Sequence, residues 1–232
     1  MKAKLLPLAA LVAGLASAFS PSAWALSVTG TASPGVVIPD NNLSGVASTI
    51  NLSTAINSIT SLTLTLDITG GYNGDFYAYL QHGAGFAVLL NRVGRTAGNT
   101  YGFADSGFQV TFDDAAASDI HLASAGTGNP LIGTYQPDGR NVSPFSALDT
   151  SPRSAFLSSF TGLDANGGWT LFVADVSPVG IGTLADWSLT VNGNALSGVP
   201  DGGAPLTLLA TALVTLVGMR WRLNRLQPSV EA

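Results

Sequence analysis

Apolar and polar side chains alternate along much of the middle of the chain. In SLTLTLDIT, residues 61–69, every second residue is Leu or Ile and the others are Ser, Thr or Asp. This period of two is typical of a β-strand with one buried and one solvent-facing side. The same period in DFYAYLQH, residues 75–82, puts Tyr77, Tyr79 and Gln81 on the outer side. Further strands are predicted at residues 35–38, 48–53, 86–91, 107–113, 168–175 and 186–193.

Gly, Asn, Asp and Pro separate these runs, as turns require, for example at residues 70–74. About eight antiparallel strands with one-sided burial predict two packed sheets, an all-β sandwich. Trp169 and Trp187 occupy matched positions in two strands that are close in sequence, and we expect those strands to pair. Residues 115–160 are rich in Gly, Ser and Pro, which predicts long loops with one helical turn near residues 113–120.

The first 25 residues have the layout of a secretory signal peptide. Lys2 and Lys4 precede an apolar run that reaches about residue 18, and Ala23 and Ala25 occupy the positions that a signal peptidase reads. The alternative is an N-terminal membrane helix that stays attached. The apolar run is short, so we expect cleavage and export.

The other end of the chain also has three parts. The motif Val199-Pro200-Asp201-Gly202-Gly203 is followed by an apolar stretch, residues 204–219, and a basic tail, residues 220–232. Sixteen residues make a helix of about 24 Å, a little short for a membrane core of about 30 Å, although flanking residues can extend it. Three arginines in the tail predict a cytoplasmic C-terminus.

The apolar stretch has three interpretations: a core helix, a permanent anchor, or a sorting signal that is cut off. The strand pattern ends near Val191, and residues 195–203 form a polar linker with the motif. A core helix is therefore disfavoured, and a transmembrane helix over residues 204–219 is expected. The folded domain is assigned to residues 26–194.

The net charge of the folded domain limits the classes of partner that it can bind. Residues 26–198 hold twelve Asp and four Arg, with no Lys or Glu, for a formal charge of −8. Such a surface repels phosphate backbones, so we exclude nucleic acid as a partner. Acidic residues that are all Asp suit oxygen-liganded cations such as calcium, or simply solvated loops. The chain has no Cys, which excludes thiol catalysis and thiolate metal sites.

No catalytic set stands out in the sequence. The chain has two histidines, His82 and His121, and both are expected in surface loops. Asp119-x-His121 has the spacing of a triad fragment, but no Gly-x-Ser-x-Gly elbow accompanies it. Paired carboxylates for glycoside hydrolysis and phosphate-binding glycine patterns are also missing from the sequence. We expect the protein not to be an enzyme, with an unrecognised hydrolase as the least favoured alternative.

Four stretches, taken in order, carry a family resemblance. They are VVIPDNNLSGVASTINLS, INSITSLTLTLDITGGYNGDFYAYLQHG, GTYQPDG and LSSFTGLDANGGWTLFVADVSPVGIGTLADWSLTV. Over residues 35–192 the chain resembles the proprotein convertase P-domain (P/Homo B domain), which implies a jelly-roll β-sandwich. In convertases this domain supports a catalytic neighbour and performs no chemistry itself.

The resemblance also implies a calcium site. The matching acidic positions are Asp40, Asp75 and Asp175. The family's usual acidic GD-x-GTL reads VGIGTL here, so Gly180-Ile181 lacks one expected carboxylate. Calcium binding and a purely structural role for the Asp residues in turns both remain open.

The C-terminal layout resembles the PEP-CTERM sorting signals of Gram-negative bacteria, in their VPDGG or VPDSG variant. That resemblance implies processing by an exosortase, a membrane protease, and an association with exopolysaccharide and biofilm. We therefore expect an exported module that is held in the inner membrane and then released to the cell surface or beyond. Its expected function is adhesion, or binding of extracellular polysaccharide or a surface protein. The alternative is an accessory domain for a separately encoded subtilisin-like protease.

Overall fold

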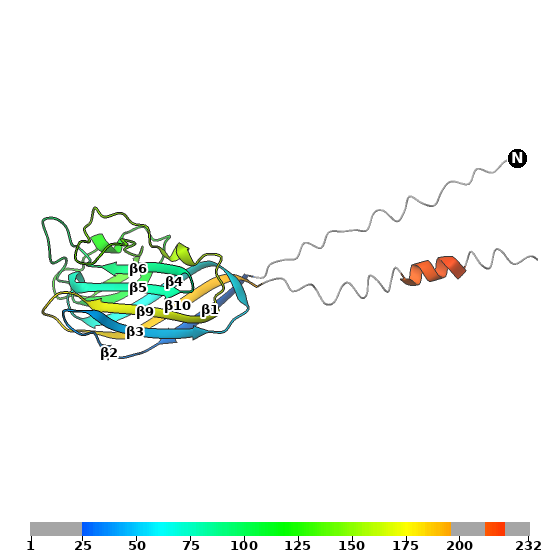
Figure 1. Ribbon diagram of the computed structural model, residues 1–232, viewed down its shortest axis with the longest axis horizontal. Helices are drawn as coiled ribbons and strands as arrows, with labels where there is room; N and C mark the ends of the chain where they lie inside the picture. The colour runs from blue at the N-terminus through cyan, green and yellow to red at the C-terminus, as the bar shows by residue number, and fades with distance from the viewer. Residues whose placement is uncertain (1–24, 196–211, 221–232) are drawn as a thin grey trace, which may run out of the picture. The chain divides into compact units, whose positions relative to one another are not determined.

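The computed structural model describes residues 25–195 and 212–220. Residues 25–195 form two packed β-sheets (Figure 1), which confirms the predicted all-β sandwich. One sheet has the order β1-β10-β4-β7-β8, with β2 also paired to β10, and the other has the order β3-β9-β5-β6. The strands are β1 (Ala25–Ala32), β2 (Val36–Val37), β3 (Asn42–Leu52), β4 (Ile56–Gly70), β5 (Phe76–His82), β6 (Gly85–Asn91), β7 (Gly107–Phe112), β8 (Leu131–Tyr135), β9 (Gly167–Asp175) and β10 (Gly182–Ala195).

Period-two alternation places the core between the sheets. The inward set of β4, residues 62, 64, 66 and 68, is at most 4% exposed. The facing sheet contributes buried side chains from β5 and β9, including Phe76 and Trp169. Gly71 and Gly182 lie against the Phe76 ring, and a Cβ at either position would overlap that ring.

Three expectations about strands were wrong. β7 and β8 pair in parallel, whereas all pairs were expected to be antiparallel. β8 and the short helical turns η3 (Ile120–Leu122) and η4 (Leu157–Phe160) give structure to a region expected to be long loops. β1, which pairs with β10 along its whole length, was not predicted, because its Ser, Thr and Gly residues give a weak apolar signal.

The two tryptophan strands do not pair with each other. β9 belongs to the four-stranded sheet and β10 to the six-stranded sheet, so Trp169 and Trp187 enter the core from opposite sides. Trp187 Nε1 donates a hydrogen bond of 2.9 Å to Ser48 Oγ on β3. This hydrogen bond joins the two sheets.

The terminal predictions fall mostly outside the described residues. Ala23 and residues 199–203 lie outside them, while Ala25 begins β1 and pairs with Asn194. Residues 212–220 form a helix, and residues 204–211 are not described. Within the described ranges, no helix is both long and apolar enough to cross a membrane. The transmembrane helix and the sorting signal therefore stay predictions.

The bond between the sheets makes a stability prediction. Trp187→Phe is expected to lower the free energy of unfolding by about 1–3 kcal/mol, through the lost hydrogen bond and lost ring volume. Ser48→Ala alone should cost about 1 kcal/mol. The double variant should cost less than the sum of the two single variants, because both remove the same bond. Urea unfolding followed by tryptophan fluorescence measures this, and fully additive losses would contradict it.

Candidate functional site

Three carboxylates lie at one end of the sandwich. Asp40 lies between β2 and β3, Asp75 ends the helical turn η2 (Asn73–Asp75) before β5, and Asp175 ends β9. Phe76 is the register partner of Asp175, and the Val176 backbone N–H donates to the Asp75 carbonyl oxygen at 2.9 Å. Asp75 and Asp175 are therefore neighbours, and Asp40 is exposed but near enough for its charge to act on both. We call these three residues the Asp cluster.

The turn that carries Asp75 is fixed by the segment beside it. The Asn73 side chain accepts a hydrogen bond from the Gly107 backbone N–H at 2.9 Å. Asn73 and Gly74 donate their own backbone N–H groups to carbonyl oxygens of residues 105 and 103. A Cβ on Gly74 would overlap the backbone of residues 101 and 102, so the close approach requires glycine there.

Asp175 is the most constrained member of the Asp cluster. Its side chain is fully buried, and Oδ1 accepts a hydrogen bond from the Ser177 backbone N–H at 3.1 Å. Oδ2 is buried without a well-formed hydrogen bond, and the Asn41 backbone N–H near this carboxylate acts against the rise in its pKa. A buried carboxylate oxygen without a well-formed hydrogen bond is costly, so this atom marks a place where a proton or a cation would stabilise the fold.

Arg92 is the cation nearest to Asp75. Its NH2 atom lies 3.7 Å from Asp75 Oδ1, and its Nε donates to the Gly74 carbonyl oxygen at 2.5 Å. Burial raises the pKa of Asp75 to about 6, with Ser177 and Arg92 acting in the opposite direction. Burial, with the nearby charges of Asp75 and Asp40, raises the pKa of Asp175 to about 7. Arg92 is a single positive charge beside three carboxylates, so the Asp cluster keeps an excess of negative charge when the carboxylates are ionised.

Exposed apolar side chains surround the Asp cluster. The loop from residue 176 to 181 carries Val179 and Ile181, which are 67% and 66% exposed. Val179 has a φ of 78°, a strained conformation for a β-branched residue, and its backbone N–H donates to Asp40 Oδ2 at 3.3 Å. Tyr72 and Tyr101 border a pocket of about 210 Å³ that also contains Asp75.

The Asp cluster does not form a compact metal cage. Within residues 25–195 and 212–220, no group of three or more His, Cys, Asp or Glu side chains lies close enough to hold a metal ion. Calcium also takes backbone carbonyl and water oxygens, so two carboxylates with a third at the rim still match its donor chemistry. The buried Oδ2 of Asp175, which lacks a well-formed hydrogen bond, is the observation that fits a cation.

Both histidines are buried, which corrects the expectation of surface loops. His82 is 7% exposed and stacks on Trp169, with ring centroids 4.0 Å apart. Its ring nitrogens face the carbonyl oxygens of Gly168 at 2.9 Å and Asp164 at 2.7 Å. These oxygens accept hydrogen bonds and offer no proton that the ring could remove.

His121 is fully buried and contacts a different carboxylate from the one that its sequence spacing indicated. Its Nδ1 lies 2.7 Å from Asp138 Oδ2, and its Nε2 lies 3.0 Å from the Arg95 carbonyl oxygen. Asp119 instead accepts the His121 backbone N–H and pairs with Arg140. A carbonyl oxygen therefore stands where a serine nucleophile would have to stand in a catalytic triad.

Comparisons with known proteins leave the family open. No protein-family model and no curated protein matches the chain. Among solved structures, the chain is similar to a serine protease of Aeromonas sobria in complex with the chaperone ORF2, and to the serine protease of that organism described alone. Both are 15% identical with a TM-score of 0.42, and cover 74% and 77% of this chain. The chain spans 27% and 29% of those proteins, and a likeness this weak assigns no function.

The raised pKa values of Asp75 and Asp175 predict that the stability of the fold depends on pH. Both pKa values lie above the unfolded value of about 3.9, so the folded state holds extra protons between about pH 4 and pH 7. Ionisation of the two carboxylates therefore lowers stability as pH rises through this window. Asp175→Asn should melt several degrees above the unmodified protein at pH 8 and equal to it below pH 4.

Circular dichroism melts across this pH range, in buffer with a chelator, measure the difference. Asp149→Asn, in a loop outside the Asp cluster, is the matched control and should show no such pH-dependent gain. A lower melting temperature for Asp175→Asn at pH 8 would contradict the assignment.

Proposed function

We propose that residues 26–194 are an exported, non-catalytic interaction domain of the P-domain type, a jelly roll that binds an extracellular partner through the loops around the Asp cluster. The observation that carries this proposal is the fully buried carboxylate of Asp175, whose Oδ2 has no well-formed hydrogen bond, set beside exposed apolar loop residues. A bound cation would neutralise the negative charge of the carboxylates, and a protein or polysaccharide partner would cover the exposed apolar side chains.

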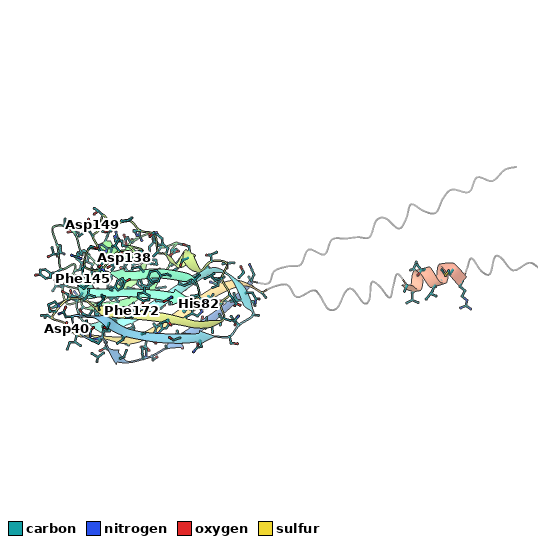
Figure 2. The ribbon with its side chains drawn as sticks, in the orientation of Figure 1. Asp40, His82, Asp138, Phe145, Asp149 and Phe172 are labelled. Carbon is teal, nitrogen blue, oxygen red and sulfur yellow. The ribbon has the colours of Figure 1, made fainter. Side chains whose placement is uncertain are left out.

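The placement of the loops supports this role. Ala25 pairs with Asn194, so both ends of the described domain lie at one end of the sandwich. The Asp cluster lies at the other end, where β10 begins and the Ile38 backbone N–H donates to the Gly182 carbonyl oxygen. β10 has 14 residues, so the two ends are about 45 Å apart. Figure 2 shows Asp40 and His82 at these opposite ends. A domain tethered by either terminus would present the Asp cluster away from its tether.

The contacts of the two histidines support a binding role over histidine-based catalysis. Each nitrogen of His82 and His121 faces an oxygen that accepts hydrogen bonds. A general base needs a free lone pair directed at the group that it deprotonates. These histidines instead hold loops in place.

Calcium is the cation that we propose for the Asp cluster. Asp75 and Asp175 would be its carboxylate ligands, with Asp40 at the rim. Ile181, where the family carries an aspartate, is exposed at the border of the cluster and adds apolar surface in place of charge. The site would therefore bind calcium weakly by itself and more tightly when a partner contributes oxygen ligands.

Calcium should raise the melting temperature of the purified protein at pH 7.5 by several degrees, because it binds the folded state selectively. Asp175→Asn should abolish this rise, whereas Asp186→Asn, which removes an exposed carboxylate of β10, should leave it intact. Differential scanning calorimetry with calcium and with a chelator measures both. An identical melting temperature in the two buffers would remove calcium from the proposal.

Export and sorting make a separate prediction. We propose inner-membrane anchoring through residues 204–219, signal peptidase cleavage after Ala25 and exosortase processing at the Val199–Gly203 motif. The mature protein should therefore begin at Leu26 and lack the apolar stretch and the basic tail. Intact-mass spectrometry of the protein from its native host measures this, and retention of residues 204–232 would contradict processing.

A further inference from the structure

A cluster of aromatic rings lies on the outer face of the four-stranded sheet. Tyr77 and Tyr79 come from β5, Phe86 from β6 and Phe172 from β9. All four are only partly buried, whereas the residues that alternate with them point into the core. We call these four residues the aromatic face. In Figure 2, Phe172 lies in the middle of the sheet that faces the viewer.

The four rings form one continuous surface across three strands. Phe172 stacks on Tyr79 with centroids 4.8 Å apart and 20° between the planes. Phe86 lies 5.1 Å from Tyr79 on the other side. Tyr77 lies 5.9 Å from Tyr79 and 6.5 Å from Phe172. Cross-strand aromatic pairs stabilise a sheet, but they also leave an apolar platform in contact with water.

The aromatic face is uncharged in a domain that is strongly acidic. In the four strands of this sheet the ionisable residues other than tyrosine are His82 and Asp175, and both are buried. The outward neighbours of the rings are uncharged. Ala47 and Ala174, the register partners of Phe172 and Tyr77, are apolar, and the neighbours one step along the strands are polar. Thr49 and Thr170 share a hydrogen bond of 3.0 Å between their hydroxyl groups, and Gln81 is exposed.

We infer that the aromatic face is a binding platform for an uncharged polysaccharide. A sugar ring combines an apolar C–H face with hydroxyl groups at its edge. Aromatic rings pack against the C–H face of the sugar. The hydroxyl and amide groups of Tyr, Thr and Gln form hydrogen bonds with the sugar hydroxyl groups. The charge of the face matches a neutral polymer, while the formal charge of −8 on the domain repels an anionic one.

This inference rests on the proposed function, since it names a partner class for the exported domain, but it uses a different surface. The aromatic face lies on the side of the sandwich, and the Asp cluster lies at its end. Polysaccharide binding should therefore need no calcium. The hydroxyl and amide groups of Thr49, Thr170 and Gln81 along one side of the rings favour a sugar polymer over a second copy of the chain.

Affinity gel electrophoresis of the purified protein tests the inference, with neutral glucans and galactomannans in one set of gels and alginate in another. The neutral polymers should retard the protein, and alginate should not. Tyr79→Ala and Phe172→Ala should each weaken retardation about tenfold, as expected for the loss of one aromatic contact. Phe145→Ala is the matched control, because it removes an aromatic ring that is 58% exposed in the loop between β8 and β9, outside the aromatic face and the Asp cluster.

A second variant keeps the test valid if an alanine variant does not fold. Thr49→Lys adds a charge at an exposed position beside the rings and leaves every ring in place, and it should also weaken retardation by neutral polymers. Asp175→Asn and chelator should leave retardation unchanged, so failure of the Asp cluster proposal is separable from failure of this one. The inference is overturned by lack of retardation in every neutral polymer, by equal retardation of folded Phe172→Ala and unmodified protein, or by a dimer that Phe172→Ala dissociates.

Discussion

A carboxylate buried at the end of a central strand is the constraint on which the loop end around Asp175 depends. β9 lies between β3 and β5, so Asp175 at its end is covered on both sides by neighbouring strands. Two loops must turn beside it, one carrying Asp40 and one carrying Asp75. Ser177 and Arg92 satisfy part of the resulting negative charge, and Oδ2 of Asp175 is left without a well-formed hydrogen bond. The folded state thus keeps a place for a proton or a cation at neutral pH.

The rest of the domain makes this arrangement possible. The large core between the sheets, with Trp169, Phe76 and Leu64 fully buried, supplies the stability that a strained and acidic loop end requires. In a second buried network, Asp138 contacts His121 and Arg140. The backbone N–H of Asn91 on β6 donates to Asp138, and the Asn91 side chain donates to the Arg140 carbonyl oxygen, so the long segment between β7 and β9 is held against the sandwich. These polar groups stabilise loops.

Much of the fold follows from local patterns. Alternation in residues 61–69 and 75–82 correctly placed β4 and β5 and correctly turned Tyr77 and Tyr79 outward. β1 was missed because Thr29, Gly30 and Thr31 give little apolar contrast. The expected pairing of the two tryptophan strands was wrong because nearness in sequence does not decide which sheet a strand joins. Here β9 and β10 join opposite sheets, whereas β5 and β6, which are also consecutive, join the same one.

The site was only partly predictable from the sequence. The resemblance to the P-domain indicated Asp40, Asp75 and Asp175, and these residues do lie at one end of the sandwich. The burial of His82 and His121 depends on Asp164, Gly168 and Asp138, which are far along the chain, so no local pattern could indicate it. The contribution of Phe86 and Phe172 to the aromatic face likewise depends on the register of β6 and β9 with β5.

The central claim is that the loop end around Asp175 is a cation-dependent binding surface. Heteronuclear NMR of the purified protein during a calcium titration tests it most directly, because each backbone amide reports separately. The account predicts that the largest shifts fall in the loops of Asp40, Asp75 and Ser177, with the amides of β1 near Ala25 unchanged. Shifts spread over the whole surface, or no shifts at millimolar calcium, would contradict it.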